Sequence, residues 1–396
     1  MSTEVATNGK VHNTSDIAVE PVVRQKDVAE KQPNSSKEGA EKKPRKKPNN
    51  KAVDCYLDID AGAKRVKCQL NGAYKAFPSE AKDIKTDVPL RNNGCFRIGK
   101  KNYVVGKAID RVNGEMIVAS QDKKLSCVEI WILGAISHYR KFLKSCVEGR
   151  RRKTEPARLN LHLRMVTLSS FKRTELNKVL KAISAFTWED TDFEVIVKSC
   201  EFIDEGEGGA LEVAHTKNLE EFHLLDLGGG TFTHSTYLWD GDELSTEAKT
   251  PISGAGMTSV INKIFKALTR VDRGAIQAEN FDIQEALELS SIGDDGAWVV
   301  PLRNNGEVQN IALEVEGALS EWTHGNYALL KQFDFISQRL ARGESVFCTG
   351  GGFAVKMVAD WIVRYLSKGI PNANIEVLEN PQHINLSGLK WLDEIE

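Results

Sequence analysis

The chain has 396 residues, a formal net charge of −2 at pH 7 and 41% hydrophobic residues. Charges so nearly balanced exclude a polycation that binds nucleic acid with its whole surface. Because no run of eighteen apolar residues occurs, we expect no membrane span and no membrane partner. The length predicts two to three domains. The N-terminus is polar from Met1 onward and shows no apolar signal-peptide region, which favours a cytoplasmic protein.

The cysteines agree with this setting. There are 7 of them, an odd number, and no Cys-x-x-Cys pair occurs. This pattern argues against a disulfide framework and against a zinc site, so we expect reduced thiols.

The first fifty residues differ in composition from the rest. They contain no Phe, Tyr or Trp and are rich in Lys, Glu, Asn, Ser and Pro. Such a segment cannot bury enough apolar area to offset the entropy of ordering, so we expect residues 1–50 to be a disordered tail. It ends in a basic run: Lys42, Lys43, Arg45, Lys46 and Lys47. The run is either a solvated linker or an electrostatic handle for an anionic partner, and any direct nucleic-acid contact is expected within residues 42–51.

From residue 53 to about 215, hydrophobic periodicity predicts strands and helices in alternation. Cys55, Leu57 and Ile59 alternate with less apolar neighbours, and Asn71-Gly72 is a strong hairpin signal. Strands are predicted over 53–59, 65–70, 73–77, 96–98, 103–105, 161–168 and 193–197. Helices are predicted over 126–147, 175–186 and 207–215.

The second half of the chain repeats the opening pattern of the first. A buried strand, an acidic residue, a glycine turn and another strand begin each half, which indicates a duplicated architecture of two facing α/β domains. Strands are predicted over 222–227, 233–239 and 345–348. Helices are predicted over 256–268, 282–289 and 312–340, with a last helix ending near residue 366.

The first glycine turn follows Asp60 and contains Gly62, Ala63 and Lys64, and the next strand carries Lys67. A glycine lets the backbone approach a phosphate closely, and successive amides can donate to its oxygens. Lys67 could add a point charge, and Asp60 could hold a hydrated divalent cation. An ordinary hairpin turn explains the same residues, so this turn decides nothing alone.

The second turn follows Asp226 and reads Gly228, Gly229, Gly230 and Thr231. A plain hairpin needs one or two glycines, and each costs about 0.5–1 kcal/mol relative to alanine. Three glycines therefore indicate that a ligand approaches the backbone, with the Thr231 hydroxyl as a further donor.

A third turn, Gly350, Gly351 and Gly352, lies between a strand and a helix, where a flat ligand can lie on the backbone and the helix N-terminus is open to an anion. Neither glycine cluster has the Gly-x-Gly-x-x-Gly spacing of a Rossmann fold, and no Walker lysine motif occurs. The order of the three turns, each about a domain length from the next, is more specific than any one of them.

In this order the turns resemble the phosphate-1, phosphate-2 and adenosine loops of the actin-like ATPase superfamily, which includes actin, MreB, DnaK-type chaperones and hexokinases. Within it the sequence is most similar to ParM-type plasmid-segregation proteins. Residues 103–108 resemble their Tyr-x-Val-Gly-x-x-Ala element, 205–210 their Glu-Gly-x-Gly-Ala connection, and 385–389 their Ala-Asn-Ala-x-Gly tail.

The likeness spans roughly residues 53–392 and implies an α/β fold of the actin-like two-domain ATPase type, with duplicated ribonuclease-H-like domains and a nucleotide cleft between them. The expected organisation is a tail (1–50), domain I (51–220, with a small subdomain at about 71–120), domain II (221–370), and a C-terminal segment (371–396) that returns to domain I.

The resemblance also implies site roles. ATP (or GTP) with Mg²⁺ would occupy the cleft, Asp60 and Asp226 would hold the metal through water, and Glu205 and Asp226 would be the catalytic residues. Glu205 would orient the attacking water; Glu207 is its rival, and a plain surface acid is the alternative. Gly254 would border the nucleotide, or merely begin a helix.

One residue departs from the family pattern. Many members carry Ser or Thr where this chain has Ala63, and the missing hydroxyl removes one hydrogen bond to phosphate, worth about 0.5–1.5 kcal/mol. Binding should survive on backbone amides, but sensing of the γ-phosphate should be weaker.

Because a fold alone does not fix function, three functions stay open at this point. The first is an ATPase that polymerises into dynamic filaments for plasmid or DNA segregation, with itself and a DNA-bound adaptor protein as partners. The second is a small-molecule kinase, and the third is a non-polymerising, nucleotide-gated binding module. The ParM-like elements favour the first.

Overall fold

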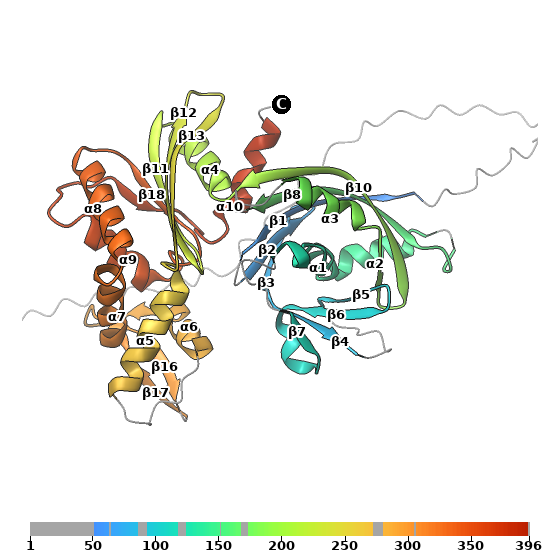
Figure 1. Ribbon diagram of the computed structural model, residues 1–396, viewed down its shortest axis with the longest axis horizontal. Coiled ribbons are helices and arrows are strands. Elements are labelled where there is room, and N and C mark those ends of the chain that lie inside the picture. The colour runs from blue at the N-terminus through green and yellow to red at the C-terminus, as the bar shows by residue number, and fades with distance from the viewer. Residues whose placement is uncertain are drawn as a thin grey trace, which may run out of the picture. The chain divides into compact units, whose positions relative to one another are not determined.

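The computed structural model describes residues 51–62, 65–85, 93–117, 124–150, 152–167, 173–271, 280–304 and 306–394. The predicted tail lies outside these ranges, with its basic run, and so do Ala63 and Lys64. The described residues form two larger sheets with helices packed against them (Figure 1). No helix in these ranges is long and apolar enough to cross a membrane.

The first sheet has ten strands. They are β1 (Val53–Ala61), β2 (Arg65–Leu70), β3 (Ala73–Pro78), β4 (Ala81–Ile84), β5 (Cys95–Ile98), β6 (Lys101–Val105), β7 (Glu115–Ile117), β8 (Ala157–Thr167), β9 (Ala185–Trp188) and β10 (Thr191–Asp204). The order in the sheet is β3-β2-β1-β8-β10-β9-β5-β6-β4-β7. Its core is filled by side chains from the strands and from helices α1 (Lys124–Ser137), α2 (Arg140–Glu148) and α3 (Arg173–Ala182), with Trp131 among the largest buried ones.

The second sheet has five strands, with two small hairpins beside it. The strands are β11 (Glu221–Leu227), β12 (Thr231–Trp239), β13 (Leu244–Ser253), β18 (Val346–Thr349) and β19 (Ile375–Val377), and the hairpins are β14 (Ser291–Ile292) with β15 (Trp298–Val299) and β16 (Pro301–Asn304) with β17 (Glu307–Asn310). The order is β13-β12-β11-β18-β19. The remaining long helices are α4 (Glu207–Lys217), α5 (Met257–Val271), α6 (Asn280–Glu288), α7 (Ala312–His324), α8 (Tyr327–Ala341) and α9 (Lys356–Leu366).

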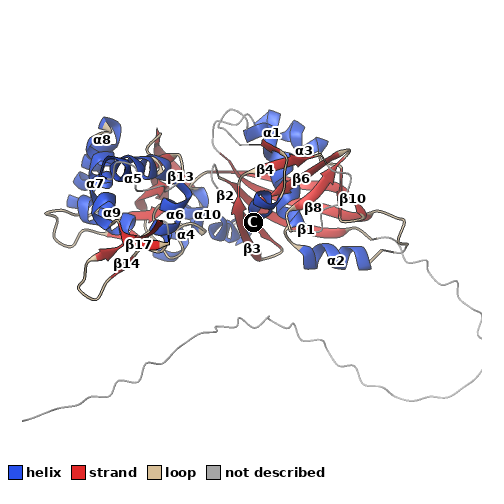
Figure 2. Ribbon diagram, turned by 90° about the horizontal axis from the view of Figure 1, so that it is seen from below, coloured by secondary structure: helices blue, strands red, loops and turns tan. Residues whose placement is uncertain are grey.

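Strand β11 is buried on both faces. Leu225 and Leu227 belong to the core built with α5, α7, α8 and α9, whereas Phe222 and Leu224 belong to the core built with α4. Alternate residues of a strand point to opposite faces, so this division follows from the strand itself. The helices therefore cover both faces of the sheet, as the blue helices around the red strands show (Figure 2).

The two sheets share one topology. In the first, β1 pairs antiparallel with β2, β2 with β3, and β1 parallel with β8. In the second, β11 pairs antiparallel with β12, β12 with β13, and β11 parallel with β18. The predicted duplication of an α/β unit is confirmed. Each copy places a glycine turn directly after its central strand.

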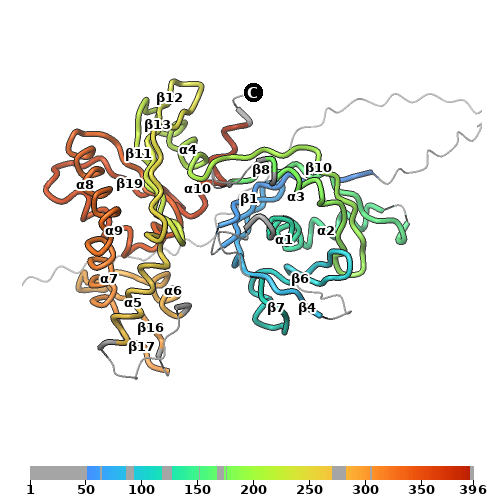
Figure 3. The backbone as a smooth tube through the Cα atoms, in the orientation of Figure 1, coloured from blue at the N-terminus to red at the C-terminus, as the bar shows by residue number. Residues whose placement is uncertain are grey.

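The last residues of the chain connect elements of both sheets. After β19 the chain forms helix α10 (Ile384–Ser387) and the 3-10 helix η3 (Gly388–Glu394), which follow β19 in the red part of the tube (Figure 3). Arg164 of β8 donates to the Leu389 carbonyl at 3.0 Å and pairs with Asp58 of β1 at 2.8 Å. The segment predicted to return to the first domain thus begins as a strand of the second sheet and ends against β8.

Two predicted long helices are each broken in two. The stretch 126–147 is α1 and α2, separated at His138 and Tyr139, and 312–340 is α7 and α8, separated at Gly325 and Asn326. The apolar spacing continues across both breaks, so periodicity alone could not reveal them. Asn326 caps α8, its side chain accepting from the Leu329 amide.

Two other differences have local causes. The helix predicted to reach residue 186 ends at Ala182, because Ala185–Trp188 pairs with β10 as β9. Strand β13 is an edge strand whose residues are mostly exposed, so it lacks the apolar alternation that would have predicted it.

A buried hydroxyl lies at the first break. Tyr139 is 6% exposed, and the single hydrogen of its hydroxyl is shared between the carbonyls of Cys68 (3.0 Å) and Ala73 (2.8 Å). Tyr139→Phe removes this donor from the buried Cys68 carbonyl and the part-buried contact with Ala73, so we expect it to lower the free energy of unfolding by about 1–3 kcal/mol. Urea unfolding measures this, with Tyr327→Phe, at a residue 72% exposed, as a control expected to change less than about 0.5 kcal/mol. Equal effects of the two changes would contradict the assignment.

Candidate functional site

Residues of all three predicted turns line one cavity of about 390 Å³. Among the residues predicted for the site, those that line it are Asp60, Gly62, Lys67, Glu205, Asp226, Gly228, Gly229, Gly230, Thr231, Gly350, Gly351 and Gly352. Gly254 does not line it, and Ala63 and Lys64 lie outside the described residues. The two acids at the ends of β1 and β11 therefore share one cavity, although many other elements separate them in the sequence.

The first turn brings a carboxylate and an ammonium together through strand register. Asp60 of β1 lies opposite Lys67 of β2 in the antiparallel pair, so both side chains leave the same face. Lys67 Nζ lies 2.9 Å from Asp60 Oδ2. Burial alone would lower the pKa of Lys67, but the charge and hydrogen bond of Asp60 raise it. Lys67 is therefore a fixed positive charge in the wall of the cavity.

Asp226 lies at the end of β11, in surroundings that disfavour its ionised form. Burial raises its pKa above the ordinary value, and the nearby Asp60 carboxylate adds to that. The positive charge of Lys67 and a hydrogen bond from Asn385 act in the opposite direction. Two carboxylates thus lie beside one buried ammonium, and a cation in the cavity would favour the ionised form of Asp226.

The second turn is fixed from behind by the start of α5. The amides of Gly254, Met257 and Thr258 donate to the carbonyls of Gly230 (2.8 Å), Gly228 (3.0 Å) and Gly229 (2.9 Å), respectively. Among the described residues no acceptor is bound to the amides of Gly229 and Gly230. Gly254 thus supports the turn from outside the cavity, which agrees with the helix-start alternative.

The third turn needs its glycines for space. Gly350 has a φ of +93°, and a Cβ there would run into the Asp226 carboxylate and the Leu227 carbonyl. A Cβ on Gly352 would run into the Leu227 side chain. At Gly351, by contrast, a Cβ would meet open space. The turn is thereby pressed against the end of β11 while its middle residue faces the cavity.

The structure separates the two candidate glutamates. Glu205 lines the cavity, and Lys249 of β13 donates to its backbone carbonyl at 2.6 Å. Glu207 is turned back instead: its Oε2 accepts from the Asp204 amide at 3.0 Å, and burial raises its pKa. Glu207 closes the first turn of α4, which leaves Glu205 as the carboxylate on the cavity side.

Several lining residues were given no role by sequence reasoning. Arg65 reaches from β2 to Glu288 of α6 at 3.2 Å, and Gln284 donates to the same carboxylate at 3.0 Å. Tyr74 and Asn385 also line the cavity, but single polar residues of this kind have no distinguishing pattern in one sequence. The only signal was the resemblance of 385–389 to a family tail, which carried no role.

The lining fits a nucleotide with a divalent cation. The amides of Gly229 and Gly230, for which the described residues provide no acceptor, suit phosphate oxygens. The open space at Gly230 and Gly351 is a volume that any side chain would reduce. Apolar side chains of Met257, Ile261 and Leu287 line another part of the cavity, as a base requires. Asp60 and Asp226 supply the oxygen ligands that Mg²⁺ prefers.

No protein-family model matches the sequence, and no curated protein matches it. Solved structures do. An archaeal actin homolog, Ta0583, has a TM-score of 0.60 at 16% identity, over 86% of this chain and 100% of that chain. The same protein in complex with ADP has a TM-score of 0.55 at 14% identity, over 86% and 100%.

Filament structures match as well. A ParM filament from Clostridium botulinum has a TM-score of 0.56 at 15% identity, over 86% of this chain and 99% of that chain. A MamK double helical filament has a TM-score of 0.56 at 14% identity, over 86% and 99%.

Two duplicated α/β units with glycine turns around a shared cavity define the class: the chain has the two-domain fold of actin-like ATPases. Within that class its architecture is ParM-like. At these sequence identities the comparison establishes the fold, which confirms the predicted fold class and resemblance.

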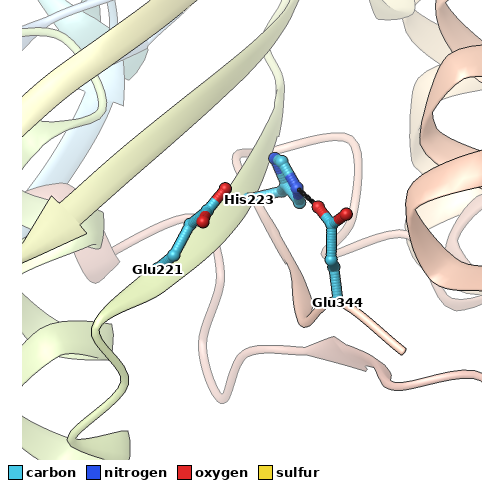
Figure 4. Close-up of side chains that lie close together, drawn as sticks. All are labelled: Glu221, His223 and Glu344. Carbon is cyan, nitrogen blue, oxygen red and sulfur yellow. Dashed lines mark hydrogen bonds and ion pairs between the residues drawn. The ribbon is translucent and has the colours of Figure 1, made fainter. Parts of the chain in front are cut away.

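A second polar cluster lies on the second sheet, away from the cavity lining. Glu221, His223 and Glu344 bring three atoms of metal-ligating type within 4.8 Å of one another (Figure 4). His223 Nε2 lies 2.7 Å from Glu344 Oε2, and Arg339 donates to both oxygens of Glu344 at 3.2 and 3.3 Å. Because a guanidinium already occupies this carboxylate, the cluster is better described as a hydrogen-bond network that fastens α8 and β18 to β11.

The neighbouring His234 gives the protein an acid-sensitive site, and His138 gives it another. Burial lowers the pKa of His234 from 6.5 to about 3 and that of His138 from 6.5 to about 4. The unfolded chain therefore binds protons first as the pH falls. The contribution of each histidine to stability is full above about pH 6.5, and it falls by up to about 1.4 kcal/mol per pH unit between there and the folded pKa of that histidine.

Urea unfolding at about pH 7.5 and about pH 5 tests this. We expect His138→Asn to reduce the loss of stability on acidification relative to wild type. An unchanged pH dependence in the variant would contradict the assignment.

Proposed function

We propose that this chain binds ATP (or GTP) with Mg²⁺ in the cavity, hydrolyses it slowly, and assembles into dynamic filaments in the cytoplasm. One observation carries the proposal: three turns far apart in the sequence, each at the end of a strand, line the same cavity with two carboxylates and a lysine. ADP is bound by one structural neighbour, and others are filaments.

Phosphoryl transfer to water needs positioning and charge neutralisation more than covalent chemistry. The amides of Gly229 and Gly230 and the ammonium of Lys67 would bind the phosphate oxygens. Asp60 and Asp226 would hold Mg²⁺ through water, and the ion would neutralise phosphate charge. Glu205 would accept a hydrogen bond from the attacking water and orient it. Lys249, bound to the Glu205 carbonyl, keeps that turn in place.

The proposed cellular role is the movement or segregation of plasmid or other DNA, with a DNA-bound adaptor protein as the partner. The basic run at 42–47 is a candidate contact with an anionic partner. This role rests on the ParM-like architecture alone.

Sedimentation and light scattering with Mg-ATP, Mg-GTP or Mg-ADP, beside phosphate release, test the proposal. The expected result is pelleting that requires the triphosphate and Mg²⁺ and that reverses as phosphate is released. A chain that releases phosphate but stays monomeric at every concentration would overturn the filament part. A chain that neither binds nor hydrolyses nucleotide would overturn the whole proposal.

A further inference from the structure

Asn385 is a buried polar side chain that no catalytic assignment above uses. It lies on the short helix α10, is 6% exposed and lines the cavity. A buried amide is costly unless its donors and acceptor are paired. Its partners therefore indicate what holds it there.

The two ends of the Asn385 amide bind different elements. Its Nδ2 donates to Asp226 Oδ2 at 3.4 Å, and its Oδ1 accepts from the Gly209 amide at 3.2 Å. The partners fix the orientation, because a flipped amide would place oxygen against a carboxylate and hydrogen against an N–H. An aspartate could keep only the contact to Gly209, and an aliphatic residue could keep neither.

The backbone around Asn385 has no freedom to move away. A Cβ on Gly208 would run into the Asn385 carbonyl, and a Cβ on Gly388 would run into the Gly208 carbonyl. α10 and η3 therefore touch the first turn of α4 backbone to backbone. This contact holds the Asn385 side chain at the end of β11.

The two partners of Asn385 belong to the two halves of the proposed chemistry. Asp226 is the acid at the end of β11, and Gly209 lies in the first turn of α4, which begins directly after Glu205 and Gly206. Gly206 has a φ of +93°, so the chain turns sharply between Glu205 and the helix. A shift of the first turn of α4 would move Glu205 with it.

We propose that Asn385 is a positioning residue that fixes the Asp226 carboxylate and the Glu205 turn relative to each other. The inference rests on the proposed nucleotide hydrolysis for its rate effect, but the contact with α4 can be tested without nucleotide. Its effect should appear in kcat rather than in KM, since Asn385 aligns the glutamate proposed to orient the attacking water with the carboxylate proposed to hold the metal.

Two variants distinguish the contacts made by the two ends of the Asn385 amide, and a third serves as a control. Asn385→Asp keeps an acceptor for the Gly209 amide and loses the donor to Asp226, whereas Asn385→Ala loses both. Trp391→Phe is the matched control in the same segment: it removes the 2.8 Å hydrogen bond from Trp391 Nε1 to Glu212 of α4 and keeps the ring stacked on His215.

We expect both Asn385 variants to lower the kcat of phosphate release about tenfold or more, with KM within about threefold of wild type. Trp391→Phe should keep the wild-type kcat.

Hydrogen exchange of the nucleotide-free full chain measures the contact between Asn385 and α4 separately. We expect faster exchange in the peptide spanning 206–211 for Asn385→Ala, and near-wild-type exchange for Asn385→Asp. Wild-type exchange in Asn385→Ala would overturn the inference whatever the nucleotide assays show. An unchanged kcat in both variants of an active enzyme would also overturn it, while an inactive wild type with the expected exchange pattern would reject the proposed function and retain the contact.

Discussion

Glu205→Ala is expected to slow phosphate release by about 100-fold or more while ATP still binds. Glu205 lines the cavity and is the carboxylate proposed to orient the attacking water, and its turn is fixed by the 2.6 Å hydrogen bond from Lys249 to its backbone carbonyl. The change removes the carboxylate without disturbing that backbone contact. Single-turnover phosphate release and equilibrium binding of ATP separate the two effects, and filaments formed with ATP should persist longer.

Glu207→Gln is the matched comparison for this prediction. Glu207 accepts from the Asp204 amide at 3.0 Å and does not line the cavity, so its loss should affect the start of α4 far more than the chemistry. We expect this variant to keep phosphate release within about threefold of wild type. If the rate loss fell on Glu207 and spared Glu205, the assignment of the two glutamates would be reversed.

Asp226→Asn is expected to change stability and function in opposite directions. The pKa of Asp226 is raised from its ordinary value of 3.8, chiefly by burial, so the ionised form is disfavoured in the folded, nucleotide-free protein. The neutral amide removes one of two carboxylates that share Lys67, while Asp60 keeps its 2.9 Å contact with that lysine. The variant without nucleotide should therefore melt at a higher temperature than wild type near neutral pH.

The pH dependence follows from the sign of the shift. The folded pKa lies above the unfolded one, so the cost of ionising Asp226 is absent below about pH 3.8, grows as the pH rises towards the folded pKa, and is complete above it. The advantage of Asp226→Asn should thus shrink on acidification.

With Mg-ATP bound, wild type should become more stable to heat than Asp226→Asn. A ligand at 100 times its Kd stabilises the protein that binds it by about 2.7 kcal/mol. Wild type should gain this, and the variant should gain much less because a cation-holding carboxylate is gone. Thermal melts with and without Mg-ATP measure both effects. A variant that is less stable than wild type when empty, or equally stabilised by Mg-ATP, would contradict the role given to Asp226.

The sequence could predict those parts of the site that depend on residues close together in the chain. Three glycines after Asp226 exceed what a hairpin needs, and the structure places all three on the cavity. Asp60 and Lys67 are brought together by a hairpin whose strands were readable from their alternation, so their pairing follows from register.

The parts that could not be predicted depend on tertiary contact. Asn385 meets Asp226 and Gly209 only because α10 packs against α4, and Glu288 of α6 meets Arg65 only through the fold. Gly254 was expected beside the nucleotide from the family resemblance, with a plain helix start as the alternative, but its amide donates to the Gly230 carbonyl. Local sequence does not tell which of these two partners a helix start takes.

The fold shows the same division. The alternation of apolar residues predicted the central strands of both sheets and so the duplication. The break at Tyr139 was not predicted because the apolar spacing continues through it. The Tyr139 hydroxyl contacts the carbonyls of Cys68 in β2 and Ala73 in β3, which are distant in the sequence.

Equilibrium binding of Mg-ATP to the full chain, in wild type and two glycine variants, tests most directly whether the cavity holds the nucleotide. Gly351 lines the cavity and Gly317 lies exposed on α7; at both, an added Cβ meets open space. Gly351→Leu should therefore fold and occupy the volume proposed for ATP, while Gly317→Leu serves as the control. We predict one ATP per wild-type chain, an affinity at least about tenfold weaker in Gly351→Leu, and a wild-type affinity in Gly317→Leu. Undiminished binding by a folded Gly351→Leu, or no binding by wild type, would contradict the account.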